Sequence, residues 1–342
     1  MNILAFESSC DETAVAVVRD GRTVLSDAIL SQADMHALYG GVVPEIASRK
    51  HVEAISGLTD RALSDAGLTK KDIDAVAVTY APGLIGAVLV AVSFAKSVAY
   101  SLGVPLIPVH HIRGHIAANY LAFPELKPPF LALAISGGNT LIVDVKDYTD
   151  MEILGATRDD AAGECFDKAA RVLGLPYPGG KPMDELAQQS PGGVYHLPRA
   201  HVDGADLDMS FSGLKTAVVN LAHNAQQKGE TLDRAALARD FARAVSDELV
   251  PRTMEAARRS GRRTIVAAGG VAANSVIRAD LQAACDEAGC TLFVPPLSLC
   301  GDNGAMIGAQ GYYEYLAGRR GSLSLNAYAF TQGDGSAENP YR

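Results

Sequence analysis

Cysteine is scarce in this 342-residue chain, which has five cysteines and no CxxC pair. The odd, dispersed set argues against a disulfide framework and against a thiolate zinc site: Cys10, Cys165, Cys285, Cys290 and Cys300. Tryptophan is absent, and aromatic residues make up 6% of the chain, whereas 48% is hydrophobic. This composition excludes a disordered or low-complexity protein, and the unpaired cysteines predict a reducing, cytoplasmic location.

A surplus of positive charge is also lacking, because 30 Lys and Arg face 39 Asp and Glu, a net charge of −9. No surface-wide positive field exists to capture a polyanion. A nucleic acid partner must therefore bind a local patch or a partner subunit.

Signals for export and membrane insertion are weak. No basic and apolar leader precedes the first apolar segment, Ile3-Leu4-Ala5-Phe6, so we expect no export by that route. The stretch 75–95 has 21 residues without a charge, but Pro82-Gly83 interrupts it and Lys96 follows. We expect a strand, a turn and a helix, and no membrane partner.

Two common nucleotide-binding motifs are missing. The closest approach to a Walker A motif, residues 174–182, has the wrong spacing and a proline where Ser or Thr must meet magnesium. No GxGxxG follows the first predicted strand. These absences exclude P-loop and dinucleotide-binding proteins.

An internal repeat is present. Apolar residues 3–6, a polar turn and apolar residues 14–18 recur as residues 130–135, Ser136-Gly137-Gly138-Asn139-Thr140 and residues 141–145. Aligning Thr13 with Thr140 gives an offset of 140 − 13 = 127 residues, about one domain. Further strands alternate with helices, so we predict two related α/β halves.

Glycine, proline and polar residues that separate apolar segments predict the helices and strands of the second half. Helices are expected at about 163–173 and 232–260, and a long loop or small insertion at about 188–208. A strand at 264–268 enters a glycine turn, and Asn274 is placed to open the next helix. The chain after Gly321 is polar, and we expect it to be only partly ordered.

A histidine cluster carries the clearest chemistry. In a helix, His111 and His115 stand at i and i+4 on one face, close enough to share a metal. Ile112 occupies the position where an HExxH metalloprotease has its general base. Asp302 is the best remote carboxylate ligand, although it could equally be a helix N-cap. Two histidines and one carboxylate would leave open positions on iron or zinc.

Small-residue turns and acidic residues supply further candidates. The turns Ser136-Gly137-Gly138, Gly179-Gly180 and Gly269-Gly270 can act as phosphate-binding nests or be ordinary tight turns. Asp11 and Glu12 lie in the first turn, and acidic residues such as Asp167 flank later ones. Such carboxylates bind metals or sugar hydroxyls and act as bases, or they are charges at helix starts.

Several of these segments together resemble the tRNA N6-adenosine threonylcarbamoyltransferase family, the bacterial TsaD type formerly named O-sialoglycoprotein endopeptidases. The resemblance extends over nearly the whole chain, and the matching motifs follow in the family's order: Glu7-Ser8-Ser9-Cys10-Asp11-Glu12-Thr13, Tyr39-Gly40-Gly41-Val42-Val43-Pro44-Glu45, His110-His111-Ile112-Arg113-Gly114-His115-Ile116, Asp159-Asp160-Ala161-Ala162-Gly163-Glu164, Ser210-Phe211-Ser212-Gly213-Leu214-Lys215-Thr216 and Ala268-Gly269-Gly270-Val271.

The resemblance implies a duplicated, actin-like ATPase fold of the α/β class, shared with sugar kinases and Hsp70, with an interdomain cleft. The first lobe is expected to comprise residues 1–109 and about 303–330, and the second lobe residues 110–302, with 331–342 as a tail.

The resemblance also implies site residues. The family's metal ligands fall on His111, His115 and Asp302, with iron(II) favoured over zinc(II) as the one divalent metal per chain. Its nucleotide and substrate contacts fall on Ala134, Ile135, Ser136, Gly137, Gly138, Asp167, Gly180, Asp184 and Asn274. Arg113 and Asn139 stand where bacterial members often carry Glu and His. Neither is a proposed ligand, so the expected metal site is unaffected.

The implied reaction moves a threonylcarbamoyl group from threonylcarbamoyl-AMP to the N6 amine of adenosine 37 in tRNAs that read codons beginning with A, and releases AMP. Such an acyl transfer needs a polarised carbonyl, a stabilised leaving group and a deprotonated amine. Asp11 or Glu12 could orient the amine or take its proton. The implied partners are tRNA, threonylcarbamoyl-AMP or ATP, a paralogous actin-like subunit and a small ATPase subunit.

Two other functions stay open. An O-carbamoyltransferase of the same fold would use carbamoyl phosphate and release phosphate instead of AMP. A non-enzymatic, nucleotide-gated scaffold would need no group of two histidines and a carboxylate.

Overall fold

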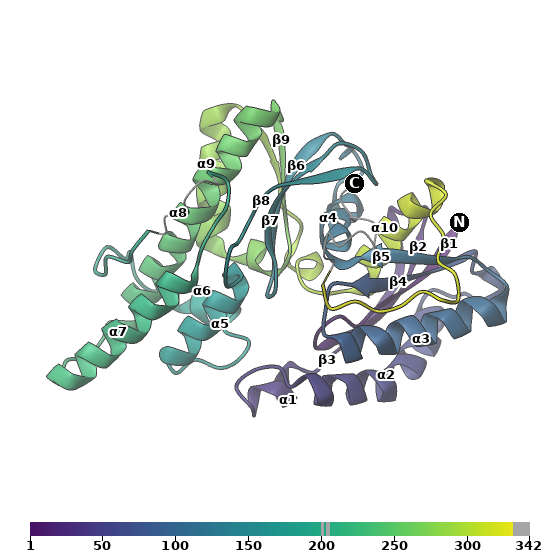
Figure 1. Ribbon diagram of the computed structural model, residues 1–342, viewed down its shortest axis with the longest axis horizontal. Coiled ribbons are helices and arrows are strands. Elements are labelled where there is room, and N and C mark those ends of the chain that lie inside the picture. The colour runs from purple at the N-terminus through teal and green to yellow at the C-terminus, as the bar shows by residue number, and fades with distance from the viewer. Residues whose placement is uncertain (200–201, 203–205, 331–342) are drawn as a thin grey trace. The chain divides into compact units, whose positions relative to one another are not determined.

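The computed structural model describes residues 1–199, 202 and 206–330 and divides the chain into two units (Figure 1). Unit 1 comprises Met1–Pro128, Val145–Glu152 and the chain from Pro295 onward. Unit 2 comprises Pro129–Asp144 and Ile153–Val294.

Unit 1 contains a five-stranded sheet in the order β3-β2-β1-β4-β5. Its strands are β1 (Asn2–Glu7), β2 (Glu12–Arg19), β3 (Thr23–Ser31), β4 (Ala75–Ala81) and β5 (Leu106–His110). β1, β2 and β3 pair antiparallel, whereas β1, β4 and β5 run parallel, with Ala5 opposite both Ala16 and Ala77. The carboxyl ends of the three parallel strands therefore lie at one edge of the sheet.

Helices cover both faces of this sheet (Figure 1): α1 (Ala33–Ala37), α2 (Pro44–Asp65), α3 (Ile85–Leu102), α4 (His111–Ala122) and α10 (Gly304–Leu316). Alternate residues of a strand point to opposite faces. Leu4 and Phe6 pack with residues of α2 and α3, and Ile3 and Ala5 pack with residues of α4 and α10. Both faces of the sheet are therefore buried at β1, whereas much of the edge strand β3 is exposed.

The uncharged stretch 75–95 forms the predicted strand, turn and helix, since β4 ends at Ala81 and α3 begins at Ile85. Among the described residues, α3 is the one helix with the length and apolarity to cross a membrane. This is weak evidence for a span, because core helices have the same properties. Ala91 and Val92 of α3 pack into the core, and Lys96 Nζ donates to Leu325 O at 3.0 Å.

Unit 2 repeats the sheet of unit 1 in the order β10-β9-β6-β7-β8. Its strands are β6 (Phe130–Ile135), β7 (Thr140–Val145), β8 (Met151–Ala156), β9 (Thr264–Ala268) and β10 (Thr291–Phe293), although the last residue of β7 and the first two of β8 are grouped with unit 1. β6 occupies the place of β1, and β9 and β10 those of β4 and β5, with parallel pairing of β6 to β9 and of β9 to β10. The predicted duplication is confirmed.

The helices of unit 2 are α5 (Ala162–Val172), α6 (Gly180–Ala187), α7 (Ser212–Lys228), α8 (Arg234–Ser260) and α9 (Ser275–Ala288). α5 and α8 begin within two residues of their predicted starts, and Asn274 caps α9 as predicted. Leu131, Leu133 and Ile135 pack with these helices in one core. The described residues of the predicted loop 188–208 contain no helix or strand.

The boundaries of the units differ from those expected for the lobes. α4 and residues 295–302 belong to unit 1 and not to the second half. The reason is close packing of α4 on α10, because a Cβ at Gly114 would lie 2.7 Å from Ile307 Cδ1. The predicted tail, residues 331–342, lies outside the described residues.

Candidate metal centre and substrate-binding residues

The histidine cluster lies in unit 1, where the parallel strand β5 ends. β5 ends at His110 and α4 begins at His111, so both histidines of the predicted pair fall in the first turns of a buried helix. Asp302 comes two residues before the start of α10, which packs on α4. Asn303, and not Asp302, is the N-cap of α10, and its Oδ1 accepts from Met306 N at 2.8 Å. The carboxylate of Asp302 is therefore free of the capping role.

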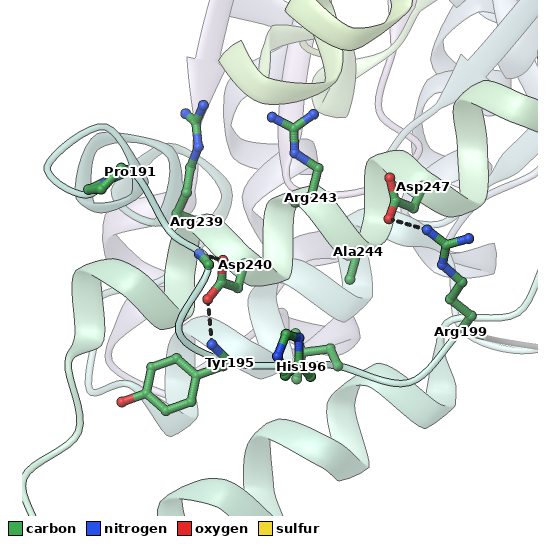
Figure 2. A pocket seen from close by; sticks show the side chains of 11 residues that line it. Pro191, Tyr195, His196, Arg199, Arg239, Asp240, Arg243, Ala244 and Asp247 are labelled. Carbon is green, nitrogen blue, oxygen red and sulfur yellow. Dashed lines mark hydrogen bonds and ion pairs between the residues drawn. The ribbon is translucent and has the colours of Figure 1, made fainter.

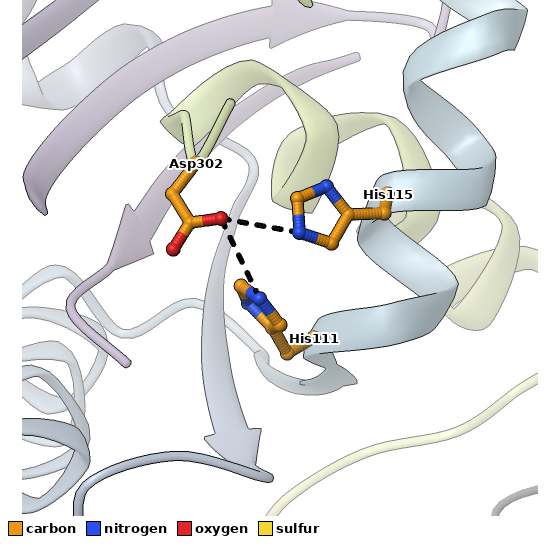
Figure 3. Close-up of side chains that lie close together, drawn as sticks. All are labelled: His111, His115 and Asp302. Atoms are coloured by element: carbon orange, nitrogen blue, oxygen red, sulfur yellow. Dashed lines mark ion pairs between the residues drawn. The ribbon is translucent and has the colours of Figure 1, made fainter. Parts of the chain in front are cut away.

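The three predicted ligands come together (Figure 3). Asp302 Oδ1 lies 3.1 Å from His115 Nε2 and 3.6 Å from His111 Nε2. One ligand atom from each residue fits within 4.8 Å, and the two imidazole rings are inclined by 79°. Both histidines are buried, and the side chain of Asp302 is 17% exposed.

These residues fit a divalent metal. Atoms bound to one zinc or iron at about 2.1 Å and about 90–110° lie about 3.0–3.4 Å apart. The two distances from Asp302 Oδ1 to the imidazole nitrogens, 3.1 Å and 3.6 Å, are close to this range. Among the described residues, the buried ring nitrogens of His115 have no hydrogen-bond partner, although Nε2 lies 3.1 Å from Asp302 Oδ1. Buried polar atoms are normally hydrogen-bonded, so a buried imidazole nitrogen that faces a carboxylate without a hydrogen bond is typical of a metal ligand.

Glu7, the last residue of β1, lies behind His111. Glu7 Oε2 lies 3.0 Å from His111 Nδ1, and its carboxylate also accepts from Thr79 Oγ1 and from Ser9 N. Ser9 Oγ lies 3.1 Å from the same imidazole nitrogen. Because Glu7 engages Nδ1, the ring presents Nε2 to Asp302, as in carboxylate–histidine–metal arrangements.

Charge around the three side chains shifts their pKa values. Burial lowers the pKa of His111, but Glu7 and Asp302 outweigh it and raise the value to about 9. Burial raises the pKa of Asp302, but His111 and His115 bring it down to about 2. The pKa of Glu7 is likewise lowered overall, because His111 outweighs burial. The metal-free site therefore holds an imidazolium between two carboxylates at neutral pH.

Asp11 ends the turn between β1 and β2 in unit 1, and Glu12 is the first residue of β2. Asp11 is buried, and its backbone oxygen accepts from Gln32 N at 3.0 Å. Glu12 Oε1 accepts from Ser31 Oγ at 2.9 Å. Burial, Asp302 and Asp11 together raise the pKa of Glu12 to about 9. Glu12 thus lies within electrostatic reach of the metal ligand Asp302.

A buried hydrogen-bond network supports this turn. His51 Nε2 lies 2.9 Å from Cys10 O, and His51 Nδ1 lies 2.7 Å from Thr13 Oγ1. Gln32 joins the network through its side chain, which contacts His36 at 3.3 Å. Burial is the main reason that the pKa of His51 is lowered, so its ring is neutral at neutral pH.

The predicted substrate residues fall in unit 2. Ala134 and Ile135 are buried at the end of β6, and Ser136 N donates to Asn139 O at 2.8 Å to close the turn before β7. Gly137 and Gly138 are exposed at its tip, with open space beside each and neither in the left-handed φ region.

The close backbone approach expected of glycine occurs at other positions. Gly269 has φ +91°, and a Cβ there would lie 2.4 Å from Ile135 O. A Cβ at Gly163 would lie 2.6 Å from Ser136 O. These two glycines bring the ends of β6 and β9 and the start of α5 together.

The remaining predicted residues connect helix starts in the same unit. Asp167 Oδ1 accepts from Gly179 N at 2.7 Å, next to Gly180 at the start of α6. Asp184 Oδ1 accepts from Ser275 N at 2.9 Å and from Ser275 Oγ at 2.7 Å. Asn274 Oδ1 accepts from Val276 N and Ile277 N. These polar side chains have structural hydrogen bonds besides any part in binding substrate.

Sequence reasoning missed the groups that support His111, namely Glu7, Ser9 and Thr79. A usable signal exists for two of them. Glu7 and Thr79 are polar residues at or near the carboxyl ends of parallel strands, the edge at which α/β sheets place their sites.

A separate cavity of about 390 Å³ lies in unit 2 between α8 and the segment after α6 (Figure 2). It contains none of the predicted site residues. Arg243 pairs with Asp280 and Arg199 with Asp247, while Asp240 accepts from three backbone N–H groups of residues 193–195. Two of the three arginines that line the cavity, Arg199 and Arg243, are thus paired with aspartates.

Known proteins of similar fold were found among solved structures. Component A of (R)-2-hydroxyglutaryl-CoA dehydratase from Acidaminococcus fermentans matches with a TM-score of 0.55 at 15% identity, covering 93% of this chain and 98% of that chain. The ROK hexokinase of Thermus thermophilus matches with a TM-score of 0.50 at 15% identity, covering 93% of this chain and all of that chain. The predicted fold class is confirmed: the chain has the actin-like ATPase and sugar kinase fold.

Sequence comparison is more specific. The family model described as TsaD, tRNA N6-adenosine threonylcarbamoyltransferase, matches residues 23–309. A protein of Moorella thermoacetica with that name is 54% identical over 326 residues, which cover 95% of both chains. On this evidence the chain belongs to the tRNA N6-adenosine threonylcarbamoyltransferase family, whose members modify tRNA.

Proposed function

We propose that this chain transfers the threonylcarbamoyl group of threonylcarbamoyl-AMP to the N6 amine of adenosine 37, beside the anticodon of tRNAs that read codons beginning with A. The observation that carries the proposal is the group His111, His115 and Asp302 in a chain with relatives named for this transfer. A nucleotide-gated scaffold has no use for such a group.

The bonds of this transfer balance without a redox step. The N6 nitrogen attacks the carbamoyl carbon, a C–N bond forms, and the bond from that carbon to the phosphate oxygen breaks. AMP leaves with the electron pair, and the amine gives up one proton to a base. We assign Asp11 and Glu12 to this step, because Asp11 ends the turn after β1 and Glu12 begins β2 in the unit that contains the metal ligands. Glu12, whose pKa is raised to about 9, holds its own proton at neutral pH and would orient the amine, whereas Asp11 would accept the proton.

His111, His115 and Asp302 would hold a divalent metal, for which we favour iron(II) over zinc(II). When bound, such an ion supplies a Lewis acid that polarises a carbonyl and stabilises negative oxygen. Glu7 fixes the orientation of the His111 ring, so the two imidazole nitrogens and Asp302 Oδ1 are arranged before any ion arrives.

We assign the adenylate to the residues of unit 2 that the family resemblance marks. Gly137 and Gly138 in the turn Ser136-Gly137-Gly138, and Gly180 at the start of α6, offer backbone N–H groups without side chains that would block a phosphate. Ala134, Ile135, Asp167, Asp184 and Asn274 would shape the surroundings of the nucleotide.

We further propose that this chain works with partner subunits in the cytoplasm. A paralogous actin-like subunit and a small ATPase subunit would act with this chain in the cytoplasm. The net charge of −9 is a reason to expect partner subunits in tRNA binding, because the chain alone lacks the positive field that holds tRNA.

The test is a reconstituted reaction of the metal-loaded chain with these subunits, threonylcarbamoyl-AMP and unmodified tRNA. We expect one AMP released for each threonylcarbamoyladenosine formed, with loss of both in His115→Ala. His223→Ala, an exposed histidine on α7, is the matched control and should react normally. Phosphate release from carbamoyl phosphate, without tRNA modification, would show an O-carbamoyltransferase instead.

A further inference from the structure

A buried ion pair joins the two helices that bear the metal ligands. Arg113, on α4 between His111 and His115, is 1% exposed. Its Nη1 donates to Glu314 Oε1 on α10 at 3.0 Å and to Thr149 O at 3.1 Å. All of these residues belong to unit 1.

The carboxylate of Glu314 is held from further directions. Gln310, one turn earlier on α10, donates from Nε2 to Glu314 Oε1 at 2.7 Å and to Tyr148 O at 3.0 Å. Arg319 Nε lies 3.2 Å from Glu314 Oε2. Glu314 is 2% exposed, so the position of this acceptor is fixed by the protein and not by solvent.

Such a pair is directional. Nη1 of Arg113 donates to two fixed acceptors, Glu314 Oε1 and Thr149 O, and a buried charge without its partner is strongly unfavourable. Rotation of α4 about its axis, or a slide along α10, would separate Arg113 from Glu314. The pair therefore restricts the rotation and register of α4 on α10.

The metal ligands are divided between the same two elements. His111 and His115 are on α4, and Asp302 comes two residues before α10. A small rotation or slide between the helices would change the 3.1 Å and 3.6 Å separations of their ligand atoms. We propose that Arg113 is a positioning residue that, through Glu314, holds the two histidines at metal-binding distance from Asp302; this rests on the metal site of the proposed function.

A purely stabilising pair would behave differently from a positioning one. Replacing both members with methionine removes the buried guanidinium and the buried carboxylate together, which is often neutral or stabilising. Arg319 then loses its contact with Glu314, but its side chain is 40% exposed and its charge stays hydrated. The double replacement does not restore the directional contact. Stability and metal affinity should then separate in the double variant Arg113→Met/Glu314→Met.

The experiment measures Zn²⁺ affinity of the metal-free full-length chain by competition with a chromophoric chelator, alongside the thermal midpoint. We expect Arg113→Met to lower both. Arg113→Met/Glu314→Met should recover a midpoint near that of the unchanged protein and still bind Zn²⁺ at least about tenfold more weakly. If the single variant does not fold, the double variant decides.

The matched control is Arg262→Met/Asp144→Met, which removes a doubly hydrogen-bonded pair in unit 2 and should leave Zn²⁺ affinity unchanged. Unchanged Zn²⁺ affinity in the Arg113 and Glu314 double variant would overturn the positioning role. Retention of Zn²⁺ by His115→Ala would instead overturn the metal site itself, so the two failures are distinguishable.

Discussion

At the residue scale, the carboxylate behind an imidazole determines what His111 can bind. Glu7 engages Nδ1, so Nε2 faces Asp302, and the same carboxylate helps to keep a proton on the ring while no metal is present. Metal binding needs the neutral imidazole, because the lone pair of Nε2 must be free. Binding and proton release are therefore coupled at this residue.

The coupling predicts a pH dependence of metal affinity. The pKa of His111 is raised to about 9 in the metal-free protein, so below that pH the ring is protonated and each metal ion must displace at least one proton. Affinity should therefore increase with pH, by about tenfold or more per unit between about 6 and 8. Zn²⁺ competition titrations across this range measure the slope.

Glu7→Gln provides the control for this prediction. Loss of the Glu7 charge should lower the pKa of His111 and reduce the proton release at pH 8, because less of the metal-free ring is then protonated. A metal affinity that does not change between pH 6 and 8 in the unchanged protein would contradict the coupling.

The turn at Gly137 gives a second prediction at the residue scale. Gly137 is exposed and has open space for a side chain, so Gly137→Val should leave the fold intact. If the turn meets the phosphate of the adenylate, the added side chain should weaken nucleotide binding about tenfold or more, with metal content unchanged. Calorimetry with ATP measures this, and an unchanged dissociation constant would mean that the phosphate site is elsewhere, for example at Gly179-Gly180.

At the element scale, glycine brings the ends of strands and helices together in unit 2. Gly269 combines a left-handed φ of +91° with a carbonyl 2.4 Å from the position of an added Cβ. The end of β9 can therefore approach the end of β6 at this place only while the residue is glycine.

We expect Gly269→Ala to lower the free energy of unfolding by about 2–4 kcal/mol, because it adds both a backbone clash and an unfavourable φ. Gly137→Ala is the matched variant and should change it by less than about 0.5 kcal/mol, since its side chain would meet open space. Denaturant titrations compare the two. Equal losses would show that the close approach at Gly269 is not what holds these strands.

Much of this arrangement was predictable from local patterns. The strand–turn–strand repeat at Thr13 and Thr140 predicted the duplicated sheets, and the spacing of His111 and His115 predicted a pair on one helix face. Asp302 was ambiguous until the structure placed Asn303 at the cap, because adjacent Asp and Asn both suit that position.

The features that the sequence did not predict depend on contacts between segments that are distant in the chain. Glu7 and His111 are 104 residues apart and meet only because β1 and β5 flank β4 in one sheet. The expected lobe boundary after residue 109 misplaced α4, because its packing on α10 is not visible in local periodicity. α7 was not predicted, and its start lies inside a family motif at Ser212.

At the scale of the whole molecule, charge limits what the chain can bind alone. Three arginines that lie close together in the sequence are paired with acids: Arg258 and Arg259 with Glu255, and Arg262 with Asp144. With a net charge of −9, the chain has no overall positive field to hold the phosphates of a tRNA.

We therefore predict weak tRNA binding by the isolated chain at physiological salt, at least about tenfold weaker than in the presence of its partner subunits. Fluorescence anisotropy with labelled tRNA, at low and physiological salt, measures both affinities. Tight binding and repeated turnover by the chain on its own would contradict this prediction.

The central claim is that the group of His111, His115 and Asp302 serves tRNA threonylcarbamoylation. Its most direct test is mass spectrometry of nucleosides from the tRNA of cells depleted of this protein and supplied with either the unchanged chain or His115→Ala. We predict that threonylcarbamoyladenosine falls on depletion and returns with the unchanged chain and with His223→Ala, but not with His115→Ala. Unaltered threonylcarbamoyladenosine after depletion, or full recovery with His115→Ala, would contradict the claim.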